Sequence, residues 1–530
     1  MQRVMLGVWV TLTLAVVACG KSSHRPHPRV MGGEAGELAA GSPAVGGATA
    51  RGGGTQGGVG QAGLDAVGGS GTAGSPEIHD PRFVLIEPPT APSQVKLSAG
   101  VIALQPSDVI ASFPEDLSVS DDGSVVVGTW TYVFRSVGST TGAFGQAFRW
   151  TEKTGSVTLI EPPDGVPSKP SRSLGMSRDG SVVFARIEEE AGSGHACRWT
   201  AAQGCLQLGD QQLNVFADTC IDSPSRCSNN SGESLVVITG PLFAMARWSA
   251  TKGWEQLPAL PIDVDDAGNV LLKGEQGLAL WLASGAVLPL ALPVGFGTCQ
   301  ARLSASGTLL AGGCTANDDH MSAFRWPSPQ MVEPWNGLVE VGNIAPDGSS
   351  AVGLGVMQDA VGSHRVVQYW DEEDGVVTVE DPGAGGFAVA NQTLSRDGQG
   401  LFGGVLLNPE LVECFRWSKT DGRHKLNPPS FHLMQPTADS SDTSVIGGNA
   451  SLPGEVYRAT IWDDLGPRFV DDELRALGIA LGVLSLEGVF FVEKLDSEVR
   501  VLGTLRTAPN STDEHEKQAG ALYLAHLPLR

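Results

Sequence analysis

Short runs of apolar residues alternate with polar turns along most of the chain. In residues 117–128 the letters LSVS-DDG-SVVVG place a turn between two apolar runs. Asp-Gly between β-branched residues is a strong hairpin signal, because glycine adopts a positive φ without steric cost. A third run, AFRWT, follows a variable segment, and a fourth, VTLIEPP, follows a glycine-containing turn. Such a unit predicts four short antiparallel strands in about 45 residues.

The same unit recurs over most of the chain. Clear copies of the turn stand at 120–123, 177–180, 304–307, 345–348 and 395–398, and weaker copies at 229–232, 265–268, 440–443 and 485–488. One four-stranded sheet cannot bury both of its faces, whereas stacked copies can. The nine turns therefore predict an all-β fold, a β-propeller of seven to nine four-stranded antiparallel blades.

Eight of the twelve tryptophans occupy one position of this repeat, in the third run. They are Trp150, Trp199, Trp248, Trp281, Trp326, Trp370, Trp417 and Trp462. A large flat side chain at this position fits a wedge between neighbouring sheets, although a ring of exposed, sugar-stacking aromatics is the alternative. Arginine precedes five of these tryptophans, and we expect it to pair with the turn aspartates.

The two ends of the repeat region complement each other. The last unit, with Tyr523 near the tryptophan position, stops before a fourth run, and FVLIEPP at Phe83–Pro89 is a fourth run without a unit before it. We therefore predict that the N-terminal strand completes the last blade and closes the ring, which removes exposed sheet edges. Residues 470–480 predict a short amphipathic helix before the last unit.

These repeats resemble the HAF family of extracellular repeats. The likeness rests on S-x-D-G followed by an apolar strand and AFRW, and on a last unit that ends in LAHLP. It covers residues 117–528, with ALW in place of FRW in the fourth unit and QYW in the sixth. The resemblance implies a propeller-like repeat domain in an exported protein.

The N-terminus has the form of an export signal. Arg3 precedes an apolar run, Val4 to Val17, that is short for a membrane span and ends in Ala18-Cys19. A cysteine after a small residue resembles the lipobox of bacterial lipoproteins, which implies a signal peptide over 1–18 and a lipid on Cys19. An ordinary signal peptide with an incidental cysteine is the alternative. Gly20 favours lipid anchoring at the outer membrane of the cell envelope, on its periplasmic or its outer surface.

A change in composition separates this leader from the repeats. Residues 32–74 contain 17 glycines among small polar residues and almost no large apolar side chain. Such a segment cannot offset its ordering entropy by burial. We therefore expect the lipidated cysteine and a flexible tether over 19–80, followed by one repeat domain over 81–530.

The cysteines of the repeat region predict disulfides, because an exported chain meets an oxidising compartment. We expect three pairs, Cys197 with Cys205, Cys220 with Cys227, and Cys299 with Cys314. We expect Cys414, beside an FRW triplet, to be a buried thiol. The sequence contains no C-x-x-C, so zinc is disfavoured. The acidic clusters 317–320 and 371–374 either bind a cation or are solvated loop charge.

Charge and motifs restrict the classes of function. A formal net charge of −23 disfavours nucleic acid as a partner, and the chain has none of H-E-x-x-H, G-x-S-x-G or a P-loop. We expect a non-catalytic, monomeric, membrane-anchored propeller, with no metal or cofactor, that displays loops to a protein or glycan partner. Residues 136–145, 218–230 and 510–518 are the expected contacts. The alternatives are an exported hydrolase or lyase acting on polysaccharide or peptide through carboxylates in the channel, and a structural envelope component.

Overall fold

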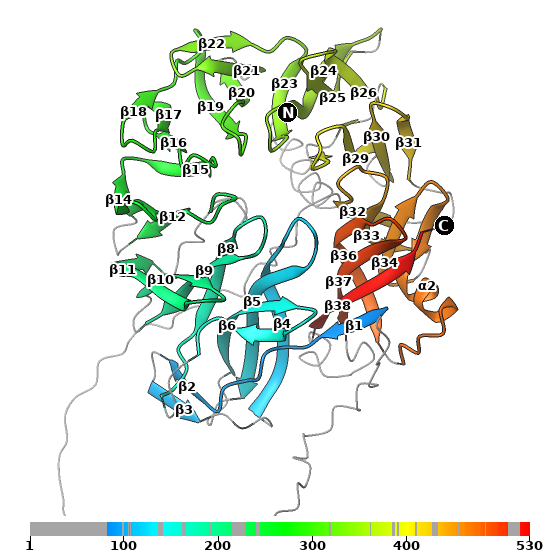
Figure 1. Ribbon diagram of the computed structural model, residues 1–530. Coiled ribbons are helices and arrows are strands. Elements are labelled where there is room, and N and C mark those ends of the chain that lie inside the picture. The colour runs from blue at the N-terminus through cyan, green and yellow to red at the C-terminus, as the bar shows by residue number, and fades with distance from the viewer. Residues whose placement is uncertain are drawn as a thin grey trace, which may run out of the picture.

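The computed structural model is a ring of nine small antiparallel sheets, the blades of a β-propeller (Figure 1). The structure describes residues 82–97, 100–103, 105, 108–135, 141–161, 166–189, 193–214, 228–239, 244–316, 318, 320–360, 362–383, 387–388, 392–408, 411–426, 433–452, 455–482, 484–506 and 520–529. The all-β propeller is confirmed, with a blade number at the upper end of the predicted range. The predicted signal peptide, Cys19 and the tether lie outside the described residues.

Within a blade, consecutive strands pair in chain order, and the first strand lies nearest the ring axis (Figure 1). The first blade consists of β4 (Val109–Val119), β5 (Val125–Arg135), β6 (Thr141–Thr151) and β7 (Gly155–Thr158), and the second of β8 (Ser171–Met176), β9 (Val182–Glu188), β10 (Ser193–Thr200) and β11 (Gly204–Asn214). The third blade contains β12 (Ser234–Thr239), β13 (Ala244–Ser249) and β14 (Gly253–Leu257). The fourth blade consists of β15 (Leu260–Val264), β16 (Val270–Gly274), β17 (Gly277–Trp281) and β18 (Val287–Pro289). Among the described residues of the third blade, the innermost position holds a single bridge between Ser228 and Leu235.

The next four blades follow the same order. The fifth blade consists of β19 (Phe296–Leu303), β20 (Leu310–Ala316), β21 (Met321–Ser328) and β22 (Met331–Pro334), and the sixth of β23 (Leu338–Ile344), β24 (Ser350–Gln358), β25 (Ser363–Asp371) and β26 (Gly375–Glu380). In the seventh blade β27 (Phe387–Ala388) and β28 (Thr393–Leu394) share the inner position, followed by β29 (Gly400–Asn408), β30 (Leu411–Ser418) and β31 (Gly422–Lys425). The eighth blade consists of β32 (Leu433–Asp439), β33 (Ile446–Ser451), β34 (Arg458–Asp463) and β35 (Gly466–Phe469). A separate hairpin, β2 (Gln94–Leu97) and β3 (Gly100–Ala103), joins the segment between blades one and two through the bond from the Lys96 N–H to the Ser168 carbonyl.

The ninth blade joins the two ends of the described chain. Its sheet order is β1 (Phe83–Ile86), β38 (Gly520–Pro528), β37 (Glu498–Arg506) and β36 (Ser485–Lys494). Phe83 is fully buried and lies opposite Ala525, with its ring 5.9 Å from that of Tyr523. Figure 1 shows β1 in blue beside β38 in red. The predicted closure by an N-terminal outer strand is therefore confirmed.

The core is divided among the seams between blades. The described residues form nine hydrophobic clusters, one between each pair of adjacent blades. Each cluster combines side chains from two neighbouring sheets. Stability therefore comes from contacts between successive blades, as in other repeat architectures.

Two predicted local features differ from the structure. Residues 485–488 were predicted to form the ninth turn, but they lie inside β36. The apolar run after Gly488 continues to pair with β37, so the hairpin turns at 495–497 instead. The predicted helix over 470–480 is the shorter α2 (Val470–Ala476), which lies between the last two blades. Among the described residues, no helix has the length and hydrophobicity to cross a bilayer.

Candidate functional site

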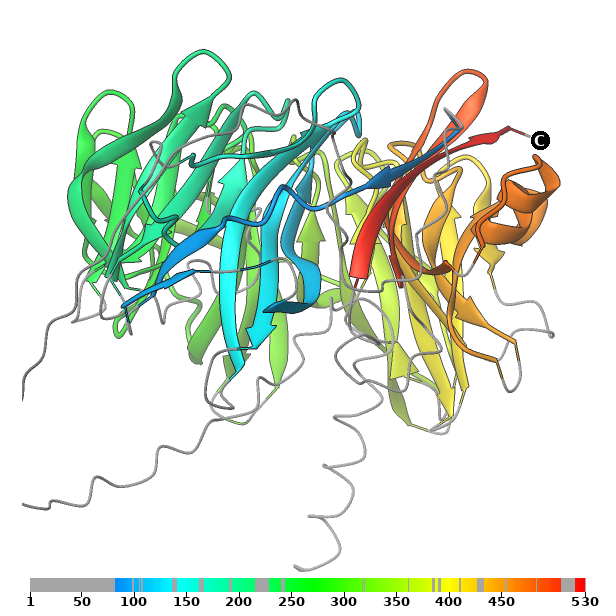
Figure 2. The same ribbon diagram turned by 90° about the horizontal axis from the view of Figure 1, so that it is seen from below.

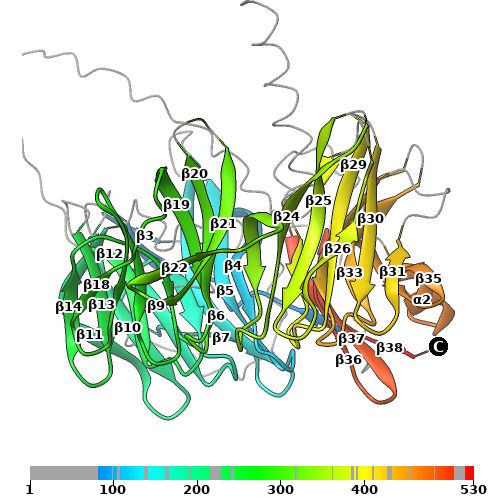
Figure 3. The same ribbon diagram turned by 90° about the horizontal axis from the view of Figure 1, so that it is seen from above.

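The strand order gives the ring two different faces, which Figures 2 and 3 show edge-on. The S-x-D-G turns between the first and second strands, and the turns between the third and fourth, share one side, which we call the turn face. The connections between the second and third strands, and those between blades, share the other side, which we call the loop face. The turn after β36 projects from the turn face (Figure 2).

The S-x-D-G turn is stabilised by its own side chains. In the second blade the Ser177 hydroxyl donates to Asp179 Oδ1 at 2.6 Å, and the Val182 N–H donates to Ser177 Oγ at 2.9 Å. The hydrogen bond from Ser177, and next that from the Ser181 N–H, lowers the pKa of Asp179. The same contacts recur in blades one, seven and eight. The turn aspartates are thus engaged within their own turns.

Four of the five arginines that precede a repeat tryptophan bond to the following blade, and the fifth, Arg325, bonds to Glu333 within its own blade. The Arg149 Nε–H donates to the Gly180 carbonyl at 3.3 Å, and the Arg198 Nε–H donates to the Gly232 carbonyl at 3.1 Å. The Arg149 guanidinium also lies 5.3 Å from the ring centroid of Trp199. The prediction that these arginines pair with turn aspartates is therefore wrong. The aspartate is already bonded inside its turn, whereas the glycine carbonyl of the next turn faces the seam.

The structure places each of the eight repeat tryptophans in the seam with the preceding blade. Each belongs to, or packs against, a different hydrophobic cluster, and Tyr523 occupies the remaining seam. Trp150, Trp281, Trp326, Trp370 and Trp462 are buried. Trp199, Trp248 and Trp417 are partly buried. The repeat tryptophans are therefore wedges between sheets and do not form a surface ring.

The turn glycine makes a close contact that can be tested. Gly180 has φ +66°, and a Cβ there would lie 2.6 Å from Val125 Cβ in the preceding blade. We expect Gly180→Ala to lower the free energy of unfolding in urea by about 3 kcal/mol, through backbone strain and overpacking.

Gly155 is the matched control for this substitution. It has φ +64°, but nothing lies within 4 Å of its Cβ position. Gly155→Ala is expected to cost only about 1 kcal/mol of backbone strain. Equal losses for the two variants would show that the contact between blades contributes nothing.

Two of the three predicted cysteine pairs are disulfides in the structure. Cys197 is bonded to Cys205, and Cys299 is bonded to Cys314. Each pair links neighbouring strands of one blade. Cys220 and Cys227 lie outside the described residues. Cys414 is fully buried in the seventh blade.

The predicted acidic clusters have different surroundings. The Lys419 ammonium of the next blade lies 2.6 Å from Asp371, 2.8 Å from Asp374 and 3.3 Å from Glu373, so this cluster already has a cationic partner within the protein. In the other cluster, Asp318 lies 2.5 Å from His320 Nδ1, and residues 317 and 319 lie outside the described part of the chain. Among the described residues, no group of three or more acidic, histidine or cysteine side chains is arranged to hold a metal ion.

Backbone hydrogen bonds link successive S-x-D-G turns around the turn face. The donors and acceptors are Asp121 N–H to Arg178 O (3.0 Å), Arg178 N–H to Asn230 O (2.9 Å), Asp266 N–H to Ala305 O (2.7 Å), Ser306 N–H to Pro346 O (2.9 Å) and Asp397 N–H to Ser441 O (3.2 Å). In each of these hydrogen bonds, the donor and the acceptor residue stand second or third in their own turns. We call this series the turn belt.

Charged side chains extend the belt to the ninth blade, whose described residues include no S-x-D-G turn. Arg396, in the seventh turn, donates to Glu493 on β36 and to the backbone carbonyl of Asp121 in the first turn. Ser441, in the eighth turn, donates to Glu493 at 2.9 Å. One arginine therefore connects blades seven, nine and one. This cluster was missed from the sequence, where the only signal is that the ninth unit lacks the turn aspartate.

Acidic side chains on the innermost strand of the first blade also have partners. The Thr131 hydroxyl donates to Glu115 at 3.0 Å. The Arg172 guanidinium, from the second blade, lies 3.9 Å from the Asp116 carboxylate. These carboxylates take part in contacts within and between blades.

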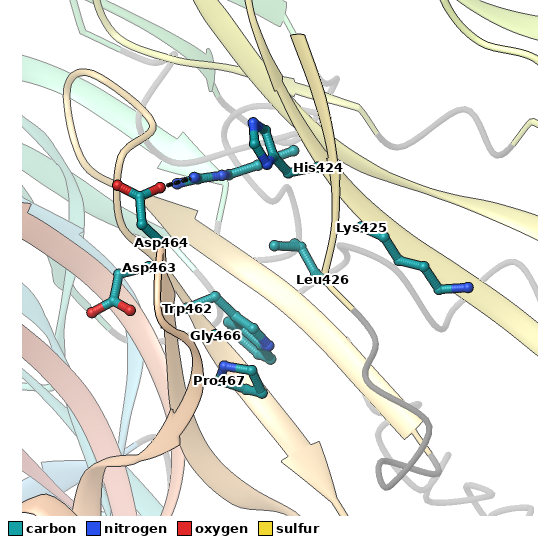
Figure 4. A pocket seen from close by; sticks show the side chains of 9 residues that line it. His424, Lys425, Leu426, Trp462, Asp463, Asp464, Gly466 and Pro467 are labelled. Carbon is teal, nitrogen blue, oxygen red and sulfur yellow. Dashed lines mark hydrogen bonds and ion pairs between the residues drawn. The ribbon is translucent and has the colours of Figure 1, made fainter. Parts of the chain in front are cut away.

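A pocket of about 300 Å³ opens at the outer edge of the seam between blades seven and eight. Figure 4 shows Leu426, Trp462 and Pro467 around it. Arg416 also lines the pocket and forms an ion pair with Asp464. Trp462 Nε1 has no hydrogen-bond partner among the described residues, but it is also out of contact with solvent. A ligand in the pocket would therefore meet apolar surface and rim charges and would not reach the indole N–H.

Comparison with known proteins gives similarity to solved structures only. No protein-family model and no curated protein sequence matches the chain, so the HAF resemblance stays a prediction. The β-propeller domain of the Trilobed protease from Pyrococcus furiosus aligns with a TM-score of 0.34 and 9% identity, over 68% of this chain and 97% of that chain. TolB from Acinetobacter baumannii aligns at 0.27 and 14%, over 54% and 78%. The acylaminoacyl peptidase of Pyrococcus horikoshii aligns at 0.37 and 10%, over 74% and 58%.

Proposed function

We propose that this chain is an exported, monomeric lipoprotein, anchored at the bacterial outer membrane through Cys19, whose propeller binds a protein or glycan partner without catalysis. The leader sequence and the two disulfides support export, because disulfides persist in oxidising compartments. A Gly-rich tether of this length has an r.m.s. span of about 45 Å. That reach holds the propeller clear of the lipid surface.

The distribution of exposed apolar side chains carries the proposal that the loop face binds. Of the ten exposed large apolar side chains in the described residues, six lie at this face, in connections or at strand ends: Val166, Leu292, Val294, Val356, Met357 and Val456. Val294 is 99% exposed. The other four, Leu206, Val287, Met331 and Leu465, lie on the turn-face side, at or next to the turns between third and fourth strands, and the S-x-D-G turns carry none. The loop face therefore carries the larger share of the exposed apolar side chains, which favours contact with a partner there.

The variation in the length of the connections also favours the loop face as the binding surface. In eight blades the first and second strands are joined by a four-residue turn, closed by a hydrogen bond from the N–H of its fourth residue to the carbonyl of its first. Connections between second and third strands range from 275–276 in the fourth blade to 507–519 in the ninth. Variable connections on a rigid scaffold are the usual carriers of binding specificity.

Substitution of the loop face tests this function. We expect the full-length protein to retain a polysaccharide or an envelope protein, on a glycan array or in a cross-linking pull-down. We expect the triple variant Val294→Ser, Val356→Ser and Val456→Ser to lose at least about tenfold in affinity for that partner, because a few buried contacts dominate binding. Leu206→Ser and Leu465→Ser, which change exposed residues at the turn-face side, are the controls.

Two outcomes would contradict this proposal. One is equal binding by the loop-face variant and the controls. The other is turnover of a polysaccharide or peptide that stops when one carboxylate is replaced, which would favour the hydrolase alternative.

Lipidation gives an independent prediction. Radiolabelled palmitate is expected to enter the wild-type protein in bacterial cells and to be absent from the Cys19→Ala variant. Cys414→Ala is the control, because that side chain is fully buried. Label of equal strength in the Cys19→Ala variant would exclude the anchor.

A further inference from the structure

The residue before the turn serine breaks the repeat pattern in the eighth blade. In six other blades this residue is apolar and packs in the seam with the preceding blade: Val119, Met176, Val264, Leu303, Ile344 and Leu394. In the eighth blade it is Asp439, the last residue of β32. A carboxyl group therefore stands at a position that is apolar in these six blades and is a serine, Ser228, in the third.

The surroundings of Asp439 do not compensate an ionised carboxylate. The residue as a whole is partly exposed, but its Oδ2 has no hydrogen-bond partner among the described residues and no contact with solvent. The charged groups that face it are Arg396 and Asp397 on the seventh turn and Glu493 on β36. Arg396 is already bonded to Glu493, so its charge is shared between two carboxyl groups.

These surroundings favour the protonated form. Withdrawal from water raises the pKa of Asp439 well above its usual value; Arg396 opposes this shift, and the negative charges of Asp397 and Glu493 add to it. The position also borders the belt link from the Asp397 N–H to the Ser441 carbonyl. Any change at this carboxyl therefore acts on the contact between two blades.

We propose that Asp439 makes the seam between the seventh and eighth blades a proton-sensitive joint, which is tight while this carboxyl carries a proton and opens more readily once the carboxyl is ionised. The joint is independent of the proposed binding face, so one proposal can fail without the other. It also lies beside Arg396, which connects blades seven, nine and one.

The direction of the pH effect follows from proton linkage. A carboxyl whose pKa is higher in the folded than in the unfolded chain binds its proton more tightly when folded. Asp439 therefore adds stability at acidic pH, and this stability is lost as the pH rises from about 4 towards its folded pKa. Asp179, whose pKa is lowered, acts in the opposite direction, and its contribution is lost as the pH falls.

Hydrogen exchange in the full-length protein tests the joint. After correction for intrinsic exchange rates, the opening constant of peptides over 393–399 and 433–443 is expected to rise with pH between 5 and 8, by at most about tenfold per pH unit. The Asp439→Asn variant is expected to lose this slope. Peptides around Ile344, at the equivalent position of the sixth blade, serve as the internal control and are expected to show none.

A second variant keeps the test decisive if Asp439→Asn folds poorly. Asp439→Leu restores the residue type of the fifth and seventh blades, and its opening constant at pH 8 is expected to be at least about tenfold below that of the wild type, because an apolar side chain packs where a charge was buried. An unchanged slope in Asp439→Asn, or easier opening of either variant at pH 8, would overturn the proposal.

Discussion

A variant that lacks residues 1–90 is expected to lose most of its stability, whereas a variant that lacks residues 1–80 is expected to unfold like the full-length protein. The difference between them is β1, the outer strand of the ninth blade. Phe83 and Ile86 are fully buried in the seams on either side of that blade. The hydroxyl of Tyr132, in the first blade, also donates to the Pro89 carbonyl at 2.5 Å.

The expected loss is large because several effects coincide. Removal of one buried aromatic side chain costs about 3–5 kcal/mol, and removal of a buried isoleucine costs about 2–5 kcal/mol. The hydrogen bonds of β38 are also exposed along one edge. A total of about 6 kcal/mol or more is comparable to the whole stability of many domains.

Thermal and urea unfolding of the two truncated variants measures this effect. Phe83→Ala in the full-length chain, with an expected loss of about 3–5 kcal/mol, separates the contribution of one side chain from that of the strand. If both truncated variants unfold at the same urea concentration, the ring does not depend on closure by β1.

Arg247→Met is expected to lower the free energy of unfolding by about 3–5 kcal/mol. Arg247 is 2% exposed, donates to the Gly268 carbonyl of the next turn and to Glu255 at 2.7 Å, and lies 4.3 Å from the ring centroid of Trp281. Methionine keeps much of the volume but removes the charge. The turn carbonyl then loses the Arg247 donor, and the Glu255 carboxylate keeps only the longer contact with Lys252 at 3.4 Å.

Arg325→Met is the matched control, because Arg325 precedes the tryptophan of the fifth blade. Its side chain is 40% exposed and pairs with Glu333 at 3.0 Å within the same blade. We expect a cost of at most about 1 kcal/mol. Chemical unfolding compares the two variants, and similar losses would show that the contact of Arg247 with the next blade is not what stabilises the seam.

The strands of a single blade and the closure of the ring were predictable from the sequence. The Asp-Gly turns, the four apolar runs and the recurring indole describe one blade almost completely, because they reflect local conformation and burial. The stray FVLIEPP run predicted closure, since a blade without a fourth strand must find one elsewhere. The ninth turn was assigned wrongly to residues 485–488, because a four-letter pattern does not reveal that a strand continues through it.

The contacts that charged side chains make at the turns were less predictable from the sequence. The turn aspartate and the arginine of the Arg-Trp pair were expected to meet, and the structure instead gives the arginine a carbonyl in the next blade. Arg396 and Glu493 are far apart in the chain, and nothing in the letters of either segment indicates their pairing. Asp439 could have been found, because it replaces an apolar residue at a defined repeat position.

The sequence by itself determined the blade, the number of units to within two and the closure of the ring, because each follows from the local spacing of apolar and turn residues. Only the tertiary structure decided which blade each charged side chain contacts, which blade lacks an S-x-D-G turn, and that Oδ2 of Asp439 is withheld from water. The physical reason is that charge pairing and desolvation depend on distances across seams between blades, and local periodicity carries no information about those distances.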